Sequence, residues 1–269
     1  MNVIGFDIGG TNTTVTIAGY NNNMVRIFSS YKFKTCKNYR DEIEAAGNFI
    51  ESGIKNYNAE IIGISIGGPV DMGHGIIINP PHLPGYWNIN LREVMEKKFN
   101  IRVNIVHDAL SSAFAEYKWG NGRNSKNMVF MTFGTGFGTG FIINGKPYYN
   151  DKHTELGYNR ISTGSKLNYD YVCSGSGLND MIKKYGEGKA IKKSLNYLSY
   201  ILSFLSNTLG LDKAVIGGVF TYRYDEFYPY VIKQFKKLSL NNMDIIPSMF
   251  GKDIGLYSSI AACVTSSHD

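Results

Sequence analysis

The sequence predicts an α/β protein built from two related lobes. Two stretches carry this prediction, because each shows a strand pattern, a bend rich in glycine and threonine, and a returning strand pattern. The first runs from Val3 to Ala18 and bends at Gly9-Gly10-Thr11-Asn12; the second runs from Asn127 to Ile143 and bends between Gly134 and Gly140. Alternating strand and helix patterns follow each hairpin, which is typical of a sheet covered by helices.

The composition is that of a globular protein. The 269 residues are 43% hydrophobic and 19% charged, enough to form a core in each of two lobes. We find no run of membrane-span length and no signal-peptide pattern, so we expect a cytoplasmic protein without a membrane partner. Three distant cysteines, Cys36, Cys173 and Cys263, suit a reducing compartment and offer no metal pair. The net charge of +6 comes from scattered Lys and Arg residues, so we expect no nucleic-acid partner.

The first lobe is expected over residues 1–119. Residues 2–34 alternate apolar and polar side chains with breaks at Gly9-Gly10 and at 21–23, which predicts three antiparallel strands. The elements expected next are a helix at 39–57, a strand at 61–66, a helix at 91–99, a strand at 101–106 and a helix at 109–119. Residues 71–90, rich in Gly, Pro and Asn, predict a long irregular loop with a functional role.

The second lobe is expected over residues 120–253, after a crossing at 120–125. A less regular region is predicted at 148–173. The remaining expected elements are helices at 176–185, 188–209 and 224–238 and strands at 214–216 and 243–246. An apolar helix at 254–265 ends the chain and is expected to pack back on the first lobe.

The two glycine bends are candidate phosphate sites. Glycine can reach φ > 0 and has no Cβ, so successive N–H groups can converge on an anion. Asp7 stands at the end of the first strand, where an unpaired carboxylate is costly unless a cation is near. Holding Mg²⁺ through water is a natural use of such a group. The alternative for each bend alone is a tight turn without a ligand.

Asp108 is the candidate catalytic acid or base. It lies where a buried-type strand meets the start of a helix, at the edge where ligands bind in α/β sheets. Its carboxylate could accept a proton from a hydroxyl that attacks phosphorus. The alternative is a helix N-cap with no further role. Gly217-Gly218, after a short strand, could admit a base or ribose, and Glu155 and Tyr158 could bind hydroxyl groups or lie in a surface loop.

The order of these motifs resembles that of the ROK family of repressors and sugar kinases. The matching stretches are Asp7–Asn12, Gly67–Val70, His107–Ala109, Gly134–Gly140, Glu155–Tyr158, Ile216–Val219 and Asp253–Ala262. Each motif alone is weak evidence, but their shared order and spacing cover nearly the whole chain. The resemblance implies a two-lobed actin-like (ribonuclease H-like) ATPase fold that closes on ATP and a sugar.

The resemblance also implies roles for individual residues. Gly9, Gly10, Thr11 and Asn12 match the first phosphate loop, and Asp7 matches its magnesium-associated acid. Gly134, Thr135, Gly136 and Gly138 match the second phosphate loop, and Gly217 and Gly218 match the adenosine motif. Asp108 matches the catalytic base, while Gly68 and Glu155 match the sugar pocket.

Three departures from the family pattern concern the sugar site. His107 stands where the family commonly has Asn, so one sugar contact differs. Tyr158 replaces a His that normally helps to hold a structural zinc, and residues 159–172 lack the expected cysteines, so that zinc site cannot form. We expect Tyr158, Tyr169 and Tyr171 to hold this loop instead. Asp170 matches the place of a sugar-binding Glu.

The expected function is transfer of the γ-phosphoryl group of ATP, with Mg²⁺, to the 6-hydroxyl of a hexose or N-acetylhexosamine. N-acetylmannosamine is the best match because zinc-less members with Tyr in place of the His resemble N-acetylmannosamine kinases, and glucose is the alternative. A sugar-sensing repressor is the alternative from another class; it would carry a DNA-binding domain before the first strand, which here starts at Val3. A non-catalytic sugar-binding module is disfavoured because Asp108 is present. By analogy with the family we expect a homo-oligomer, a dimer.

Overall fold

Two five-stranded sheets form the framework of the protein. The structure is a computed structural model and describes residues 1–21, 23–149 and 155–265. The strands of the first sheet are β1 (Asn2–Ile8), β2 (Asn12–Asn21), β3 (Met24–Lys34), β4 (Ala59–Ile66) and β8 (Arg102–His107). Those of the second are β9 (Met128–Met131), β10 (Thr139–Ile143), β11 (Lys146–Pro147), β12 (Lys213–Ile216) and β13 (Asp244–Pro247).

The two sheets have the same strand order. The first runs β3-β2-β1-β4-β8 and the second runs β11-β10-β9-β12-β13. In each sheet a central strand pairs antiparallel with the next strand of its hairpin and parallel with a later strand, as β1 does with β2 and β4 and β9 does with β10 and β12. The two glycine hairpins therefore hold equivalent places. The predicted antiparallel run over 2–34 and the predicted likeness of the two halves are confirmed.

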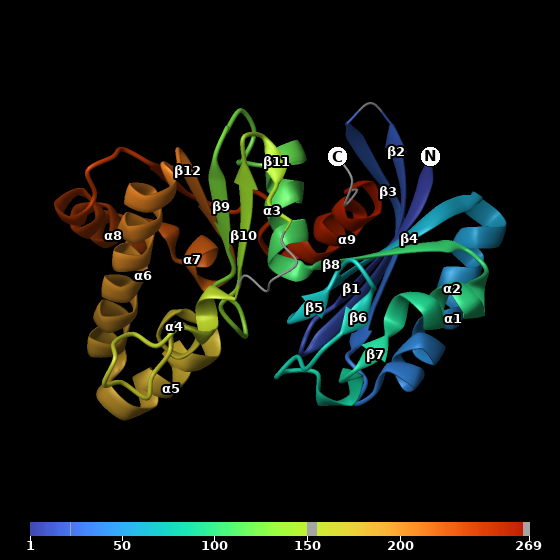
Figure 1. Cartoon of the computed structure of the whole chain (residues 1–269), viewed down its shortest axis with the longest axis horizontal. Coiled ribbons are helices and arrows are strands. Elements are labelled where there is room, and N and C mark those ends of the chain that lie inside the picture. Colours follow the sequence, from blue (N-terminus) through green and yellow to red (C-terminus); the bar gives the residue numbers. More distant parts are fainter. Residues whose placement is uncertain (22, 150–154, 266–269) are drawn as a thin grey trace.

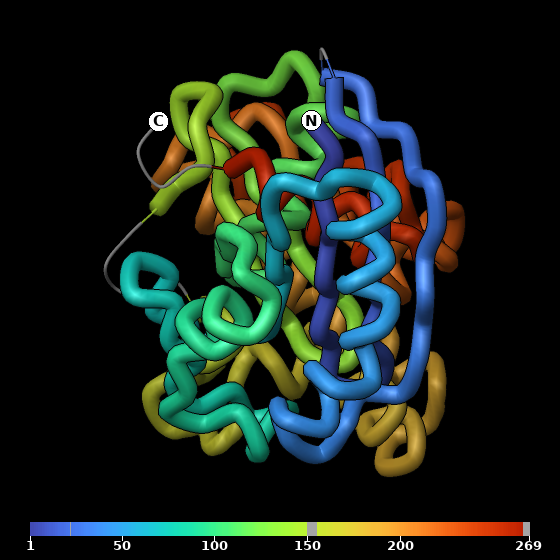
Figure 2. Tube along the Cα trace, turned by 90° about the vertical axis from the view of Figure 1, so that its right-hand side faces the viewer, coloured from blue at the N-terminus to red at the C-terminus, as the bar shows by residue number. Residues whose placement is uncertain are grey.

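Helices cover both faces of the first sheet. The four helices are α1 (Tyr39–Tyr57), α2 (Leu91–Phe99), α3 (Asp108–Trp119) and α9 (Ile254–Val264). The α1 helix starts where Asn38 accepts hydrogen bonds from two N–H groups of the first turn, and it ends at Asn58 in the left-handed conformation. Its apolar face packs with Ile4 and Phe6 of β1, and it lies in front of the sheet in Figure 2. The predicted helices at 39–57 and 91–99 are confirmed.

The loop predicted at 71–90 is more regular than expected. It contains the short antiparallel strands β5 (Val70–Asp71), β6 (Ile76–Ile77) and β7 (Ile89–Asn90) and the 3₁₀ helix η1 (Pro84–Tyr86). Strands of two residues are too short to leave an alternating pattern, which is why the sequence predicted none. Leu83 and Tyr86 of this loop are buried in the core of the first lobe. These two side chains hold the loop against the first lobe.

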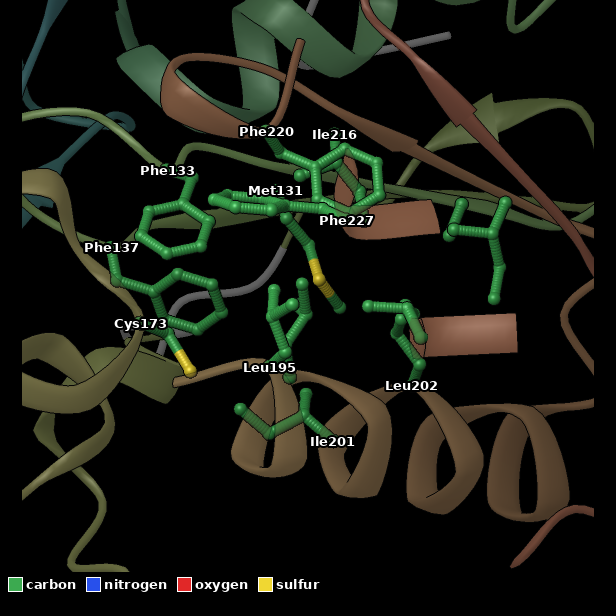
Figure 3. Packing of buried hydrophobic residues seen from close by; sticks show 14 of the residues in the cluster. Met131, Phe133, Phe137, Cys173, Leu195, Ile201, Leu202, Ile216, Phe220 and Phe227 are labelled. Atoms are coloured by element: carbon green, nitrogen blue, oxygen red, sulfur yellow. The ribbon is translucent and has the colours of Figure 1, made fainter. Parts of the chain in front are cut away.

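The second sheet packs against long helices. The helices are α4 (Tyr169–Cys173), α5 (Gly175–Tyr185), α6 (Glu187–Leu209), α7 (Val219–Tyr222) and α8 (Tyr224–Leu238), with 3₁₀ turns η2 (Leu156–Tyr158) and η3 (Gly251–Asp253). Figure 3 shows side chains of the sheet, such as Met131 and Ile216, meeting Leu195 and Leu202 of α6. The sequence predicted α5, α6 and α8 but missed α4 and α7, because helices of four or five residues show no helical period.

Helices α3 and α9 lie between the two sheets (Figure 1). The α9 helix packs on β1 and β4, and α3 packs on α9 and on β9 and β10. The chain passes between the lobes twice, after α3 and again before α9. Glu116 of α3 contacts both connections, because its carboxylate accepts hydrogen bonds from Asn121 N (2.8 Å) and from the Ser248 hydroxyl (2.5 Å). The division at residues 119/120, with the last helix assigned to the first lobe, remains our proposal.

Candidate active site

A cleft of about 520 Å³ opens between the two glycine hairpins. All the site residues predicted from the sequence line it, except Thr11 and Asn12. Those that do are Asp7, Gly9, Gly10, Gly68, His107, Asp108, Gly134, Thr135, Gly136, Gly138, Glu155, Tyr158, Asp170, Gly217 and Gly218. The fold thus brings together residues that lie up to 211 positions apart in the chain, from Asp7 to Gly218.

The first glycine loop joins β1 to β2 at the cleft. Thr35 holds it from behind, because its hydroxyl donates to Gly9 O (2.6 Å) and its N–H donates to Thr11 O (3.2 Å). Within the described residues the N–H groups of Gly10 and Thr11 donate no hydrogen bond. Unpaired amide groups at such a bend are suited to an anion.

The second loop, between β9 and β10, is held from its own lobe. Phe137 N donates to Asp170 Oδ1 (2.6 Å), Gly138 N donates to Thr132 Oγ1 (2.7 Å), and the Gly134 carbonyl accepts from Gly175 N (2.7 Å). The N–H groups of Thr135 and Gly136 donate no hydrogen bond within the part of the chain that is described. Each loop therefore presents two adjacent free amide groups.

The glycines of these loops act through their missing Cβ. We expected φ > 0, but among the bend glycines Gly9, Gly10, Gly134, Gly136 and Gly138 none has it. That expectation is wrong, because the bends turn with ordinary backbone angles. What the loops need is room: a Cβ on Gly10 would lie 3.0 Å from His82 Cβ, and one on Gly138 would lie 3.2 Å from Ala109 Cβ.

Asp108 lies at the junction of β8 and α3. One carboxylate oxygen, Oδ1, accepts from Ala109 N (2.6 Å), so the carboxylate does contact the helix start. The other oxygen, Oδ2, faces Gly67, and the side chain is 40% exposed to the cleft. The N-cap interpretation is wrong, because Asp108 is the first residue of α3 and its N-cap is His107, which makes no side-chain cap hydrogen bond. The Oδ2 oxygen of Asp108 remains available to a ligand.

His107 joins carboxylates of the two lobes. Its Nε2 lies 3.2 Å from Glu155 Oε1 and 3.5 Å from Asp108 Oδ1. Burial alone would lower the pKa of His107, but the two carboxylates outweigh it and raise that pKa to about 9. The imidazole is thus a cation at neutral pH. The backbone of Gly68 approaches both His107 and Glu155 so closely that a Cβ there would overlap them.

Asp7 forms the floor of the cleft on the first-lobe side. Burial raises the pKa of Asp7 to about 7, against hydrogen bonds from Ser65 and Ser258 that lower it. Within the described residues no cationic side chain forms an ion pair with it. A partly buried carboxylate without a countercharge fits a hydrated divalent cation. The described residues contain no group of three His, Cys, Asp or Glu side chains that could hold a metal by themselves.

Residues 159–172, which lack the zinc ligands, include a loop that is held by backbone hydrogen bonds. Ile161 N donates to Leu167 O (3.1 Å) and Tyr169 N donates to Asn159 O (3.0 Å), which pairs the two sides of the loop before α4 begins. Tyr169 packs edge-on against Tyr197. Tyr158, by contrast, is 53% exposed at the cleft and does not hold the loop, so that part of the expectation is wrong.

Gly217 and Gly218 follow directly after β12, beside the second loop. Phe133 N donates to Gly217 O (3.3 Å) and Val219 N donates to Phe133 O (2.8 Å), so the two segments are tied together. Gly218 has φ 68, and its Cα faces the Phe133 carbonyl with no room for a Cβ. This position requires glycine on both grounds.

Among the cleft residues that the sequence analysis did not single out are three with polar nitrogen-bearing side chains: His82, Asn168 and Lys252. His82 belongs to the loop that was expected to be functional, but no motif singled it out. Lys252 follows Gly251, whose φ of 50 marks the turn before α9. The available signal was indirect: His82 follows Pro81, Lys252 follows Gly251, and Asn168 is itself an N-cap residue, that of α4.

Two similar lobes with facing glycine hairpins around a shared cleft have the architecture of the two-lobed actin-like fold, which confirms the predicted fold class. The chain belongs to the ROK family, whose model matches residues 3–250. In the part of the chain that is described, we find no helix long and apolar enough to cross a membrane.

Relatives in the family have different activities. Over 144 residues, 53% of this chain and 44% of the other, the sequence is 29% identical to a glucokinase of Streptomyces coelicolor. Over 137 residues, 50% of this chain and 33% of the other, it is 30% identical to the xylose repressor of Bacillus spizizenii. The chain thus spans less than half the length of either protein.

Solved structures match over nearly the whole chain. The ROK hexokinase of Thermus thermophilus superposes with a TM-score of 0.84 at 19% identity, covering 98% of both chains. A Listeria monocytogenes protein with a proposed N-acetylmannosamine kinase activity superposes with a TM-score of 0.80 at 20% identity, covering 97% of this chain and 98% of that one. At these identities the likeness establishes the shared fold.

Proposed function

We propose that this protein is an ATP-dependent sugar kinase that phosphorylates the 6-hydroxyl of a hexose or N-acetylhexosamine. The observation that carries the proposal is the position of Asp108, whose free carboxylate oxygen stands in the cleft between two loops with unpaired amide groups. A proton acceptor facing two anion sites is the arrangement that phosphoryl transfer to a hydroxyl requires.

In this mechanism each lobe supplies one phosphate-binding loop. The amides of Gly10, Thr135 and Gly136 would bind phosphate oxygens, while Gly217 and Gly218 leave room for the adenosine. Asp7 would hold Mg²⁺ through water, and the bound ion would neutralise phosphate charge. Thr11 and Asn12 do not line the cleft, so Gly10 is the residue of the first loop whose amide is proposed to contact the phosphates.

The sugar would bind on the side of His107, Glu155, Asp170 and Tyr158. Glu155 would accept hydrogen bonds from sugar hydroxyl groups, while the His107 cation fixes the orientation of the Glu155 carboxylate. Asp108 would take the proton of the attacking 6-hydroxyl. Because positioning and charge stabilisation supply most of the acceleration in such reactions, closure of the lobes around both substrates is part of the proposal.

The preferred substrate is N-acetylmannosamine, with glucose second. Tyr158 in place of the family's usual His, and the similarity to the Listeria protein, support the first sugar; the similarity to a glucokinase supports the second. A coupled assay of ADP release over glucose, mannose, fructose, N-acetylglucosamine and N-acetylmannosamine tests the proposal. Turnover with none of them would favour a sugar-sensing protein related to the repressors of the family. A cytoplasmic homodimer without a nucleic-acid partner completes the proposal.

A further inference from the structure

The side chain of His82 lies between the two glycine loops. A Cβ on Gly10 of the first loop would stand 3.0 Å from His82 Cβ, and a Cβ on Gly136 of the second would stand 3.3 Å from His82 Nε2. The His82 side chain therefore lies with its Cβ beside the first loop and its Nε2 beside the second loop. Its sequence neighbourhood, in a loop between two short strands, gave no indication of this position.

The turn that carries His82 is firmly anchored. Leu83 N and the indole N–H of Trp87 both donate to Pro80 O (3.1 Å each), so the turn is closed on either side of the histidine. Leu83 and Tyr86 are 4% and 1% exposed and pack in the first-lobe core. The backbone that carries the imidazole is therefore fixed before any ligand arrives.

The segment between β3 and α1 contacts both the turn that carries His82 and the first loop. Gly85, three residues after His82, packs directly against the backbone of Lys37 and Asn38. Thr35, just before these residues, binds Gly9 O and Thr11 O. His82 and the amides of the first loop therefore share one support, which fixes their relative positions.

His82 has the chemistry of an additional anion contact. The side chain is exposed to the cleft, and within the described residues it forms no hydrogen bond or ion pair. The two loops that it adjoins carry the free amides of Gly10 and of Thr135 and Gly136, three residues that also line the cleft. An imidazole N–H would add a side-chain donor to these amide N–H groups, a combination that suits a phosphoryl group.

We propose that His82 Nε2 donates a hydrogen bond to the phosphoryl group that is transferred, and so joins the two loops around it. This inference rests on the proposed kinase function. The terminal phosphoryl group of ATP, which ADP lacks, is the ligand, so His82 should distinguish the two nucleotides. No covalent bond to the histidine is formed.

The test is calorimetric binding of ATP and of ADP, each with Mg²⁺, to the wild type and to variants. His82→Ala should weaken ATP binding about 10- to 100-fold, the loss expected for a hydrogen bond to a charged group, and leave ADP binding nearly unchanged. His82→Gln, which keeps a donor, should retain part of the difference. His74→Ala is the matched control, because His74 is 79% exposed and lies outside the cleft. In turnover, His82→Ala should lower kcat more than it raises the KM for the sugar.

Two results would overturn the inference in distinguishable ways. If His82→Ala binds ATP as tightly as the wild type, or loses ATP and ADP affinity equally, the histidine does not contact the transferred group. If the wild type itself binds neither nucleotide, the kinase proposal fails, and this inference fails with it.

Discussion

The imidazole of His107, at the end of β8 in the first lobe, lies 3.2 Å from the carboxylate of Glu155 in the second lobe. The same nitrogen lies 3.5 Å from Asp108, so one cation stands between the proposed base and the proposed sugar ligand. The His107–Glu155 contact therefore crosses the cleft and connects the two lobes on the side where we propose that the sugar binds.

Replacing His107 by Asn should make the protein less stable in a way that depends on pH. The pKa of His107 is raised from 6.5 to about 9, so its contribution is full below pH 6.5 and is lost as the pH rises through about 9. We expect His107→Asn to lower the free energy of unfolding by up to about 3 kcal/mol at pH 6 and by almost nothing at pH 10. Urea unfolding at both pH values measures this difference.

The control for that experiment is His74→Asn. His74 also contacts a carboxylate, that of Asp71 at 2.9 Å, but it is 79% exposed, where solvent screens the pair. Its replacement should cost little at either pH. A penalty for His107→Asn that is equal at pH 6 and pH 10 would contradict the assignment of charge to His107.

Replacing Asp108 by Asn should remove turnover while the fold is retained. The amide oxygen can still accept from Ala109 N, so the start of α3 is preserved, but the group can no longer take a proton. We expect kcat to fall about 100- to 10 000-fold, the usual contribution of a general base. ADP release measures this effect, and thermal unfolding verifies the fold. Asp180→Asn, an exposed acid 3.6 Å from Lys183, is the control; turnover near the wild-type value in Asp108→Asn would refute the mechanism.

The sheets and hairpins could be predicted because their signals are local. The alternation over 2–34 and the run of glycines from Gly134 reflect contacts within a few residues, and both were predicted with the correct strand directions. The repetition of the hairpin then implied two lobes. Asp7 and Asp108 were each predicted at the end of a strand, and both line the cleft.

The parts that were missed depend on contacts between distant segments. His82 reaches the cleft only because Tyr86 and Gly85 pack against α1 and the residues before it, and nothing in the sequence near His82 reports those contacts. The network of His107 with Glu155 joins residues 48 positions apart, and it appears only when the lobes meet. The glycines were expected to provide unusual backbone angles, whereas most of them provide space for a neighbouring segment.

Replacing Asp7 by Asn should make the protein more stable and less active. Burial raises the pKa of Asp7 from 3.8 to about 7, so ionisation opposes folding: the cost is absent below pH 3.8, grows as the pH rises and is complete above pH 7. We expect Asp7→Asn to raise the free energy of unfolding by up to about 4 kcal/mol at pH 8, without added Mg²⁺, and to change it little near pH 4. Turnover with Mg²⁺ should fall sharply in the same variant.

Urea unfolding at pH 4 and pH 8, together with the ADP assay, separates the two effects. Asp71→Asn is a suitable control, because Asp71 lies outside the cleft and hydrogen bonds from His74 lower the pKa of its carboxyl. This control should lose stability at pH 8. If Asp7→Asn were both fully active and no more stable than the wild type, Asp7 would be neither a cation ligand nor an uncompensated charge.

Replacing Gly68 by Ala should disturb the sugar side of the cleft and spare the nucleotide side. A Cβ at this position would lie 2.5 Å from His107 Cδ2 and 2.9 Å from His107 Nε2, and it would also overlap Glu155 Oε1. The imidazole and the carboxylate must therefore move apart, which breaks their contact and displaces Glu155 from the sugar. A misplacement of about 1 Å at a reacting site lowers the rate on the order of 100-fold, so we expect kcat/KM for the sugar to fall by about that factor while ATP affinity is kept.

Gly47→Ala is the control, because it makes the same change in the middle of α1, where nothing lies within 4 Å of the new Cβ. It should stabilise the protein by about 0.5–1 kcal/mol without affecting turnover. If Gly68→Ala were as active as Gly47→Ala, the close approach of Gly68 to His107 and Glu155 would have no part in binding the sugar.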